Sequence, residues 1–158
     1  MNGLQDKVIL VTGAASGLGY ADAEFLAESG ATVVMTDINE DSGKAVADRL
    51  GNLFLGLNVA DEHRWSEVML EITDRFGRLD GLVNNAGIAP IADIETTTTE
   101  VWRQTLAVHL DGTFFGCQTA LRLMKESGGG SIVSMSSTAA LIGIPDYLAY
   151  SAAKGGIR

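Results

Sequence analysis

The sequence is poor in the residue types that form disulfides and metal centres. Its 158 residues include one cysteine, Cys117, so neither an intrachain disulfide nor a cysteine-rich zinc site can form. The two histidines, His63 and His109, are too few and too far apart in the sequence to suggest a metal centre. We therefore expect no bound metal.

Positive charge and long apolar runs are also scarce. The chain has 11 Lys+Arg against 20 Asp+Glu, a net charge of −9. This balance argues against non-specific nucleic-acid binding and against docking on anionic lipid, because both need clustered cations. No apolar run approaches the roughly 18 residues of a membrane span, and residues 1–6 lack the features of a signal peptide. We expect a soluble cytoplasmic protein with no nucleic-acid or membrane partner.

Proline is rare, with two residues, whereas glycine is abundant, with 19. The glycines follow no three-residue period and form no Gly/Ser tract, which excludes a collagen-like chain and a flexible linker. They are instead expected to serve tight turns and close approaches of the backbone. The length and the 46% hydrophobic content fit a single packed domain over residues 1–158.

Short β-rich runs alternate with amphipathic stretches along the chain. Strands are predicted over residues 7–12, 32–36, 53–57, 79–83 and 131–136, and helices over 20–27, 61–76 and about 97–125. Asp61 is the candidate N-cap of the second helix, and the 3- and 4-residue spacing of its apolar residues predicts one buried stripe: Trp65, Val68, Met69, Ile72 and Phe76. Thr97 with Glu100 forms a candidate capping box for the third helix. The alternation predicts an α/β fold with a Rossmann-like, doubly wound parallel sheet that carries helices on both faces.

A glycine-rich turn joins the first predicted strand to the first helix. It contains the candidate cofactor-binding residues Gly13, Ser16, Gly17, Leu18 and Gly19. Glycines here permit a tight turn and let a pyrophosphate approach the backbone. The following helix N-terminus offers free N–H groups and the positive end of its dipole to the anion. The segment therefore predicts a dinucleotide site.

An acid follows at the distance expected for recognition of the adenosine ribose. The second strand ends at Asp37, about 20 residues beyond the turn, where a carboxylate bonds the 2′- and 3′-hydroxyls. A carboxylate there repels a 2′-phosphate. Neither Ile38, Asn39 nor the glycine turn supplies a compensating cation. NAD is therefore favoured over NADP.

The spacing Gly-x-x-x-Gly-x-Gly, with motifs further along, resembles the short-chain dehydrogenase/reductase family. The matching segments are Thr12–Gly19, Asp37, Asn84-Asn85-Ala86-Gly87, Ser136-Ser137 and Tyr150-Ser151-Ala152-Ala153-Lys154. The resemblance implies an oxidoreductase that transfers a hydride between NAD(H) and a secondary alcohol or ketone. Residues 114–118 and 124–129 look most like members that oxidise cyclic alcohols or hydroxysteroids.

The resemblance also implies further contacts with the cofactor. Asn85, Ala86 and Gly87 match the family segment beside the adenine ring. Asn58, followed by Val59, stands where the family commonly has an aspartate that accepts a hydrogen bond from the adenine amino group. The asparagine carbonyl can still accept that bond. All five residues are candidate cofactor contacts.

The catalytic prediction rests on Ser137, Tyr150 and Lys154. A phenol is a poor base at neutral pH because its ordinary pKa is about 10. A nearby ammonium favours the phenolate, and Tyr150 and Lys154 are four residues apart, so they share a helix face. By resemblance, Tyr150 exchanges a proton with the substrate oxygen, Ser137 steadies that oxygen, and Lys154 also binds the nicotinamide ribose. Tyr150 and Lys154 are therefore cofactor contacts as well.

His109 departs from the family pattern, which usually has an asparagine holding a water of a proton relay to the lysine. The imidazole could relay protons itself, because the ordinary pKa of histidine lies near neutrality. It could equally be too bulky and disturb the relay, or be a buried histidine with satisfied hydrogen bonds. His109 is kept among the candidate catalytic residues.

The chain stops four residues after Lys154, whereas family members have roughly 250 residues in one domain. The resemblance implies two further strands that these 158 residues do not contain, which leaves the fifth strand as an unpaired edge. One alternative is therefore a catalytically silent NAD-binding or interaction fragment. Another, a methyltransferase, leaves Tyr150, Lys154 and Ser137 unexplained. The family also implies a homodimer or homotetramer, for which Gly112 and Gly116 could allow close helix approach.

Overall fold

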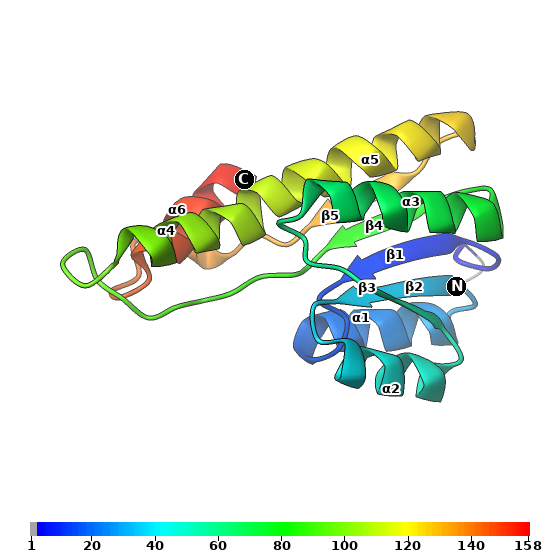
Figure 1. The fold of residues 1–158 in the computed structure, drawn as a ribbon, viewed down its shortest axis with the longest axis horizontal. Coiled ribbons are helices and arrows are strands. Elements are labelled where there is room, and N and C mark those ends of the chain that lie inside the picture. Colours follow the sequence, from blue (N-terminus) through cyan, green and yellow to red (C-terminus); the bar gives the residue numbers. More distant parts are fainter. Residues whose placement is uncertain (1–2) are drawn as a thin grey trace.

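The computed structural model describes residues 3–158 and contains one parallel five-stranded sheet in the order β3-β2-β1-β4-β5 (Figure 1). The strands are β1 (Val8–Thr12), β2 (Thr32–Asp37), β3 (Leu53–Gly56), β4 (Gly81–Asn84) and β5 (Ser131–Ser134). All four strand pairings are parallel, which confirms the predicted sheet. The strand order reverses beside β1, between β2 and β4. This is the switch point at which doubly wound sheets bind ligands.

Helices cover both faces of the sheet, as predicted. Helices α1 (Gly17–Glu28) and α2 (Glu40–Leu50) lie on one side, and α3 (Glu62–Phe76) and α5 (Gly112–Glu126) on the other (Figure 1). Along β1, Val8 and Leu10 join the core under α3 and α5, whereas Ile9 and Val11 join the core under α1 and α2. The continuous apolar run of β1 thus reflects burial on both faces.

The predicted features of α3 are confirmed. Asp61 is its N-cap, and the carboxylate accepts a hydrogen bond from the backbone N–H of Arg64 at 3.1 Å. The predicted stripe is buried at Trp65, Val68, Met69 and Ile72, whereas Phe76 is only partly buried against the core. Gly77 ends the helix with a left-handed φ of 66°.

The predicted long third helix is present as one helical run over residues 99–126, but its middle turn is a π turn. It comprises α4 (Thr99–Leu106), a π turn η1 (Ala107–Asp111) and α5. The N-cap is Thr98 rather than Thr97. The Thr98 hydroxyl accepts a hydrogen bond from the N–H of Val101, whereas the Thr97 hydroxyl donates to the carbonyl of Asp93. The wide turn of η1 carries one buried residue, His109. π turns inside helices are frequent at functional sites.

The remaining elements lie near the C-terminus. A 3₁₀ turn, η2 (Thr138–Ala140), follows β5 and packs against α6 (Leu148–Ile157). Strand β5 is an edge of the sheet, and its Val133 is 51% exposed. Within residues 3–158, no helix combines the length and the apolar character needed to span a bilayer.

Asp80, just before β4, ties the start of β1 to the sheet. Its carboxylate accepts hydrogen bonds from the N–H of Val8 and the side chain of Lys7, both at 3.0 Å, and from Arg78. Burial raises the pKa of this carboxyl, but the bonds from Arg78, Val8 and Lys7 outweigh burial and lower it to about 2.

Because this pKa is depressed, the stabilisation is complete above the ordinary value and is lost as pH falls toward 2. We expect Asp80→Asn to lower the free energy of unfolding by about 2 kcal/mol at pH 6, with the difference from wild type shrinking between pH 4 and pH 2. Urea titrations over that range measure it. Asp74→Asn, at an exposed position of α3, is the control. A difference in unfolding free energy between wild type and Asp80→Asn that does not change with pH would contradict the lowered pKa of Asp80.

Candidate functional site

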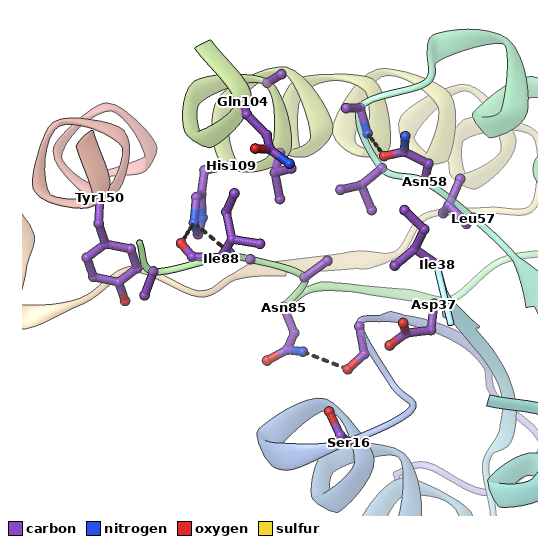
Figure 2. A pocket seen from close by; sticks show the side chains of 18 of the residues that line it. Ser16, Asp37, Ile38, Leu57, Asn58, Asn85, Ile88, Gln104, His109 and Tyr150 are labelled. Carbon is purple, nitrogen blue, oxygen red and sulfur yellow. Dashed lines mark hydrogen bonds between the residues drawn. The ribbon is translucent and has the colours of Figure 1, made fainter. Parts of the chain in front are cut away.

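A cavity of about 700 Å³ opens at the carboxyl ends of the strands. Figure 2 shows Tyr150 and His109 at one end and Asp37 with Asn58 at the other. The predicted site residues that line it are Gly13, Ser16, Leu18, Asp37, Asn58, Val59, Asn85, Ala86, Gly87, His109 and Tyr150. Gly17, Gly19, Ser137 and Lys154 do not line it.

The glycines of the turn after β1 are required for different reasons. Gly13 and Gly17 have left-handed φ angles of 66° and 56°, which non-glycine residues rarely adopt. Gly19 is required by packing, because a Cβ there would lie 2.3 Å from the carbonyl oxygen of Gly13 and 2.4 Å from Nδ2 of Asn85. Gly17 and Gly19 thus shape the turn without lining the cavity.

Thr12 and Asn85 fasten this turn to the segment after β4. The Thr12 hydroxyl accepts hydrogen bonds from the N–H groups of Asn85 and Ala86, both at 3.0 Å. In return, the side-chain amide of Asn85 donates to the carbonyls of Thr12 at 2.9 Å and Gly13 at 3.3 Å. Two stretches far apart in the sequence are thereby locked together at the switch point.

The start of α1 has the properties that an anion needs. Its N-cap, Ser16, makes no side-chain capping bond, and the first turn contains no acidic residue. The first N–H groups of the helix and the positive end of its dipole are therefore available to an anion. Together with the close backbone approach at Gly13, this fits the pyrophosphate of a dinucleotide.

The opposite end of the cavity fits an adenosine. Asp37 lies at the end of β2, with the apolar side chains of Ile38 and Leu57 nearby (Figure 2). The side-chain oxygen of Asn58 accepts a hydrogen bond from the N–H of Ala60 at 3.1 Å. An amide oxygen has two lone pairs, so one stays open for the predicted bond to adenine.

Tyr150 and Lys154 lie one turn apart on α6, and the Lys154 ammonium is 5.6 Å from the centroid of the Tyr150 ring. Lys154 is 5% exposed and donates a hydrogen bond to the carbonyl of Met135 at 2.6 Å. Burial lowers the pKa of this ammonium. The chain thus places a cation beside the phenol, as the spacing predicts.

Ser137 lies after β5, on the turn η2 that packs against α6. Its hydroxyl oxygen accepts a hydrogen bond from the N–H of Ala139 at 3.1 Å, so it caps that turn. The hydroxyl proton is not committed to any described residue. The structure brings Ser137 to the same edge of the sheet as Tyr150, and its catalytic role stays a prediction.

His109 is buried on η1 with its hydrogen bonds only partly satisfied, because its Nδ1 has no partner among the described residues. The ring is 1% exposed, and its Nε2 lies 2.7 Å from the carbonyl oxygen and 3.1 Å from the nitrogen of Ile88. The ring meets Tyr150 edge-on at 5.5 Å, and Gly87 leaves the space it needs. Burial lowers the pKa of His109, the hydrogen bond to Ile88 raises it, and the Lys154 charge lowers it. The net shift is downward, so the neutral ring is favoured.

Some cavity residues were not predicted from the sequence. These include Ile38, Leu57, Ile88 and Gln104. Isoleucine and leucine carry no chemical signature of a site. Gln104 is four residues before Val108, so both share a helix face, but the sequence does not say which face meets the cavity.

Comparisons with known proteins give a consistent result. The family model for short chain dehydrogenase matches residues 7–158. A trans-4-hydroxycyclohexanecarboxylate dehydrogenase of Sinomonas cyclohexanicum is 40% identical, over 97% of this chain and 63% of the relative. A 3-beta-hydroxysteroid dehydrogenase of Comamonas testosteroni is 41% identical, over 99% and 62%. An NADP-dependent (R)-specific alcohol dehydrogenase of Lentilactobacillus kefiri is 41% identical, over 98% and 64%.

The chain therefore spans less than two thirds of the length of each of these relatives. The matched part includes the glycine turn, Asp37, and the Tyr150–Lys154 pair. A match over nearly the whole chain, on a parallel sheet with a cavity at its switch point, identifies the chain as a member of the short-chain dehydrogenase family.

Proposed function

We propose that the chain forms the cofactor-binding and catalytic part of an NAD-dependent oxidoreductase that acts on a secondary alcohol or ketone. The supporting observation is that a single cavity is lined by the glycine turn, by Asp37 and by Tyr150. This arrangement supports the proposal because the glycine turn and Asp37 suit a dinucleotide, and the other end holds a phenol beside a buried ammonium.

The roles follow from the chemistry of the side chains. A bound nicotinamide would supply the hydride acceptor for alcohol oxidation and the hydride donor for ketone reduction. Tyr150 accepts the alcohol proton during oxidation and gives it back during reduction. Lys154 stabilises the phenolate and holds the nicotinamide ribose, while Ser137 donates a hydrogen bond to the substrate oxygen.

NAD is the proposed cofactor because Asp37 places a carboxylate at the ribose end of the cavity. Similarity to the relatives does not decide between NAD and NADP, because the Lentilactobacillus kefiri relative is NADP-dependent by its name. A 2′-phosphate beside Asp37 meets like charge, and neither Ile38 nor Asn39 supplies a cation.

Calorimetric titration of the 158-residue chain tests this proposal. We expect NAD⁺ to bind at least about tenfold more tightly than NADP⁺, and Asp37→Ala to weaken NAD⁺ and narrow that ratio. The control is Asp41→Ala, at an exposed carboxylate in the first turn of α2. Preference for NADP⁺ would contradict the cofactor assignment. Binding of neither by a folded chain would contradict the proposal.

The substrate class is proposed to be cyclic alcohols or hydroxysteroids. Two loops near Tyr150 expose Ile91, Ile94, Leu141 and Ile142, at 62–74%. A bridge between Ala92 and Tyr147 joins the loops, and the Tyr147 ring lies 6.0 Å from that of Tyr150. Such side chains favour an apolar substrate over a polyol. If NAD⁺ binds but no cyclic alcohol or hydroxysteroid turns over, the silent NAD-binding fragment becomes the better interpretation.

We also propose that the chain self-associates into a dimer or tetramer. The prediction that Gly112 and Gly116 allow close helix approach between copies is wrong. Gly112 and Gly116 face inward: a Cβ would lie 3.0 Å from the side chain of Val59 at the first and 2.6 Å from Oδ1 of Asn84 at the second. They let α5 approach its own chain rather than a copy. The exposed side chains Phe114 and Leu121 are the apolar positions that α5 offers to a partner.

A further inference from the structure

The carboxylate of Asp37 already serves two backbone groups of the protein. Its Oδ2 accepts a hydrogen bond from the N–H of Ala15 at 3.0 Å, and its Oδ1 accepts one from the N–H of Asn39 at 2.9 Å. Ala15 lies in the middle of the glycine turn, 22 residues earlier in the sequence. The side chain therefore connects the end of β2 to the turn that precedes α1.

The middle of this turn is held by the packing of Ala14 in the core and by few other hydrogen bonds. The N–H of Ala14 is bonded to the carbonyl of Thr36 at 3.0 Å, and Gly13 is held by Asn85. Beyond Ala15, a Cβ on Gly17 would meet nothing within 4 Å, so no neighbour packs there. The bond to Asp37 is thus the last tether before the first N–H groups of α1.

This tether is compatible with a bound ribose. An ionised carboxylate offers about four lone-pair positions, and the two backbone N–H groups occupy two of them. Two positions stay open for the vicinal hydroxyls of an adenosine ribose. The same carboxylate can therefore hold the turn and bind the sugar at once.

We propose that Asp37 is a positioning residue for the glycine turn, which it holds in the shape that presents the N–H groups of α1 to a pyrophosphate before any ligand arrives. The ligand part rests on the proposed function, whereas the tether belongs to the protein alone. One consequence concerns cofactor exchange. A substitution that removes the repulsion toward a 2′-phosphate also releases the turn, so it weakens dinucleotide binding generally rather than simply exchanging NAD for NADP.

Amide hydrogen exchange on the ligand-free 158-residue chain, followed residue by residue by NMR, tests the tether. In Asp37→Ala, the Ala15 amide is expected to exchange at least about tenfold faster than in wild type. The Ala14 amide keeps its backbone partner Thr36 and is expected to stay unchanged. Unchanged exchange at Ala15 would overturn the proposal.

Two further variants sharpen the test. Asn39→Ala removes the side chain that caps α2 but leaves the Ala15 bond in place, so the Ala15 amide is expected to exchange as in wild type. Asp37→Asn replaces one acceptor oxygen with an NH₂ group, so one of the two backbone N–H groups loses its partner. It is expected to speed exchange at Ala15 or at Asn39, and no change at either would overturn the proposal.

The amides of Leu10 and Val34 report whether each variant keeps the sheet. If Asp37→Ala unfolds, the exchange rates of Ala15 and Asn39 in Asp37→Asn alone test whether Asp37 tethers the turn. Adding NAD⁺ separates this proposal from the proposed function. A response of Ala15 to the substitutions without any protection by NAD⁺ would leave the tether standing and refute the cofactor assignment.

Discussion

Replacing Tyr150 with phenylalanine is expected to lower the rate of alcohol oxidation by on the order of 10²–10⁴-fold. The substitution removes the hydroxyl that we propose takes the alcohol proton, but it keeps the ring. The edge-on contacts of that ring with His109 and Tyr147 are therefore retained, and so is the adjacent Lys154. Affinity for NAD⁺ is expected to stay within about threefold, because most cofactor contacts lie elsewhere in the cavity.

The control for this variant is Tyr147→Phe. Tyr147 comes just before α6 and lies beside Tyr150, yet it does not line the cavity. Its hydroxyl is expected to be dispensable, with activity within about twofold of wild type. Initial rates with a cyclic secondary alcohol and a parallel NAD⁺ titration measure both variants. A Tyr150→Phe enzyme with more than a tenth of wild-type activity would refute Tyr150 as the proton acceptor.

Thr12→Val is expected to cost about 2–4 kcal/mol of unfolding free energy. Valine has nearly the shape of threonine, so packing at this 1%-exposed position is preserved. The hydroxyl that accepts from the N–H groups of Asn85 and Ala86 is lost, and both donors are left without that partner. We also expect weaker NAD⁺ binding, because Asn85 then holds the glycine turn less firmly.

Thr12→Ser is the matched control because it keeps the hydroxyl and removes a methyl group. Urea unfolding followed by circular dichroism compares the three proteins. The serine variant is expected to lose less than about 1.5 kcal/mol. Equal losses in the two variants would mean that the methyl group, rather than the two accepted hydrogen bonds, carries the stability.

Much of the fold was predictable because its strongest signals are local. The run of apolar residues in β1 indicates burial on both faces, and the stripe from Trp65 to Ile72 indicates one buried helix face. Once the strands are parallel, their carboxyl ends meet at one edge. Residues as distant as Gly13 and Tyr150 are then expected at one site, and they do line the same cavity.

The errors have physical reasons as well. Four consecutive threonines, residues 96–99, all carry hydroxyls that can cap a helix, so the sequence does not say which of them is the N-cap; in the structure it is Thr98. Hydrophobic spacing does not distinguish an α turn from the π turn that carries His109, because the two differ by one residue. Gly112 and Gly116 mark a close approach correctly, but their partner depends on which side of α5 faces α3 and the sheet.

The sheet order has a consequence for the order of folding during synthesis. Strand β1 is made first, but its neighbour β4 follows much later: Val8 and Asp80, which share a hydrogen bond, are 72 residues apart. At translation rates of about 5–20 residues per second, β1 waits roughly 4–14 s for this partner. Until then one side of the most buried strand has no neighbour, and Thr12 has no Asn85 to hold. In the nascent chain, the cavity at the ends of the strands can therefore form only after β4 has joined β1 on the side opposite β2.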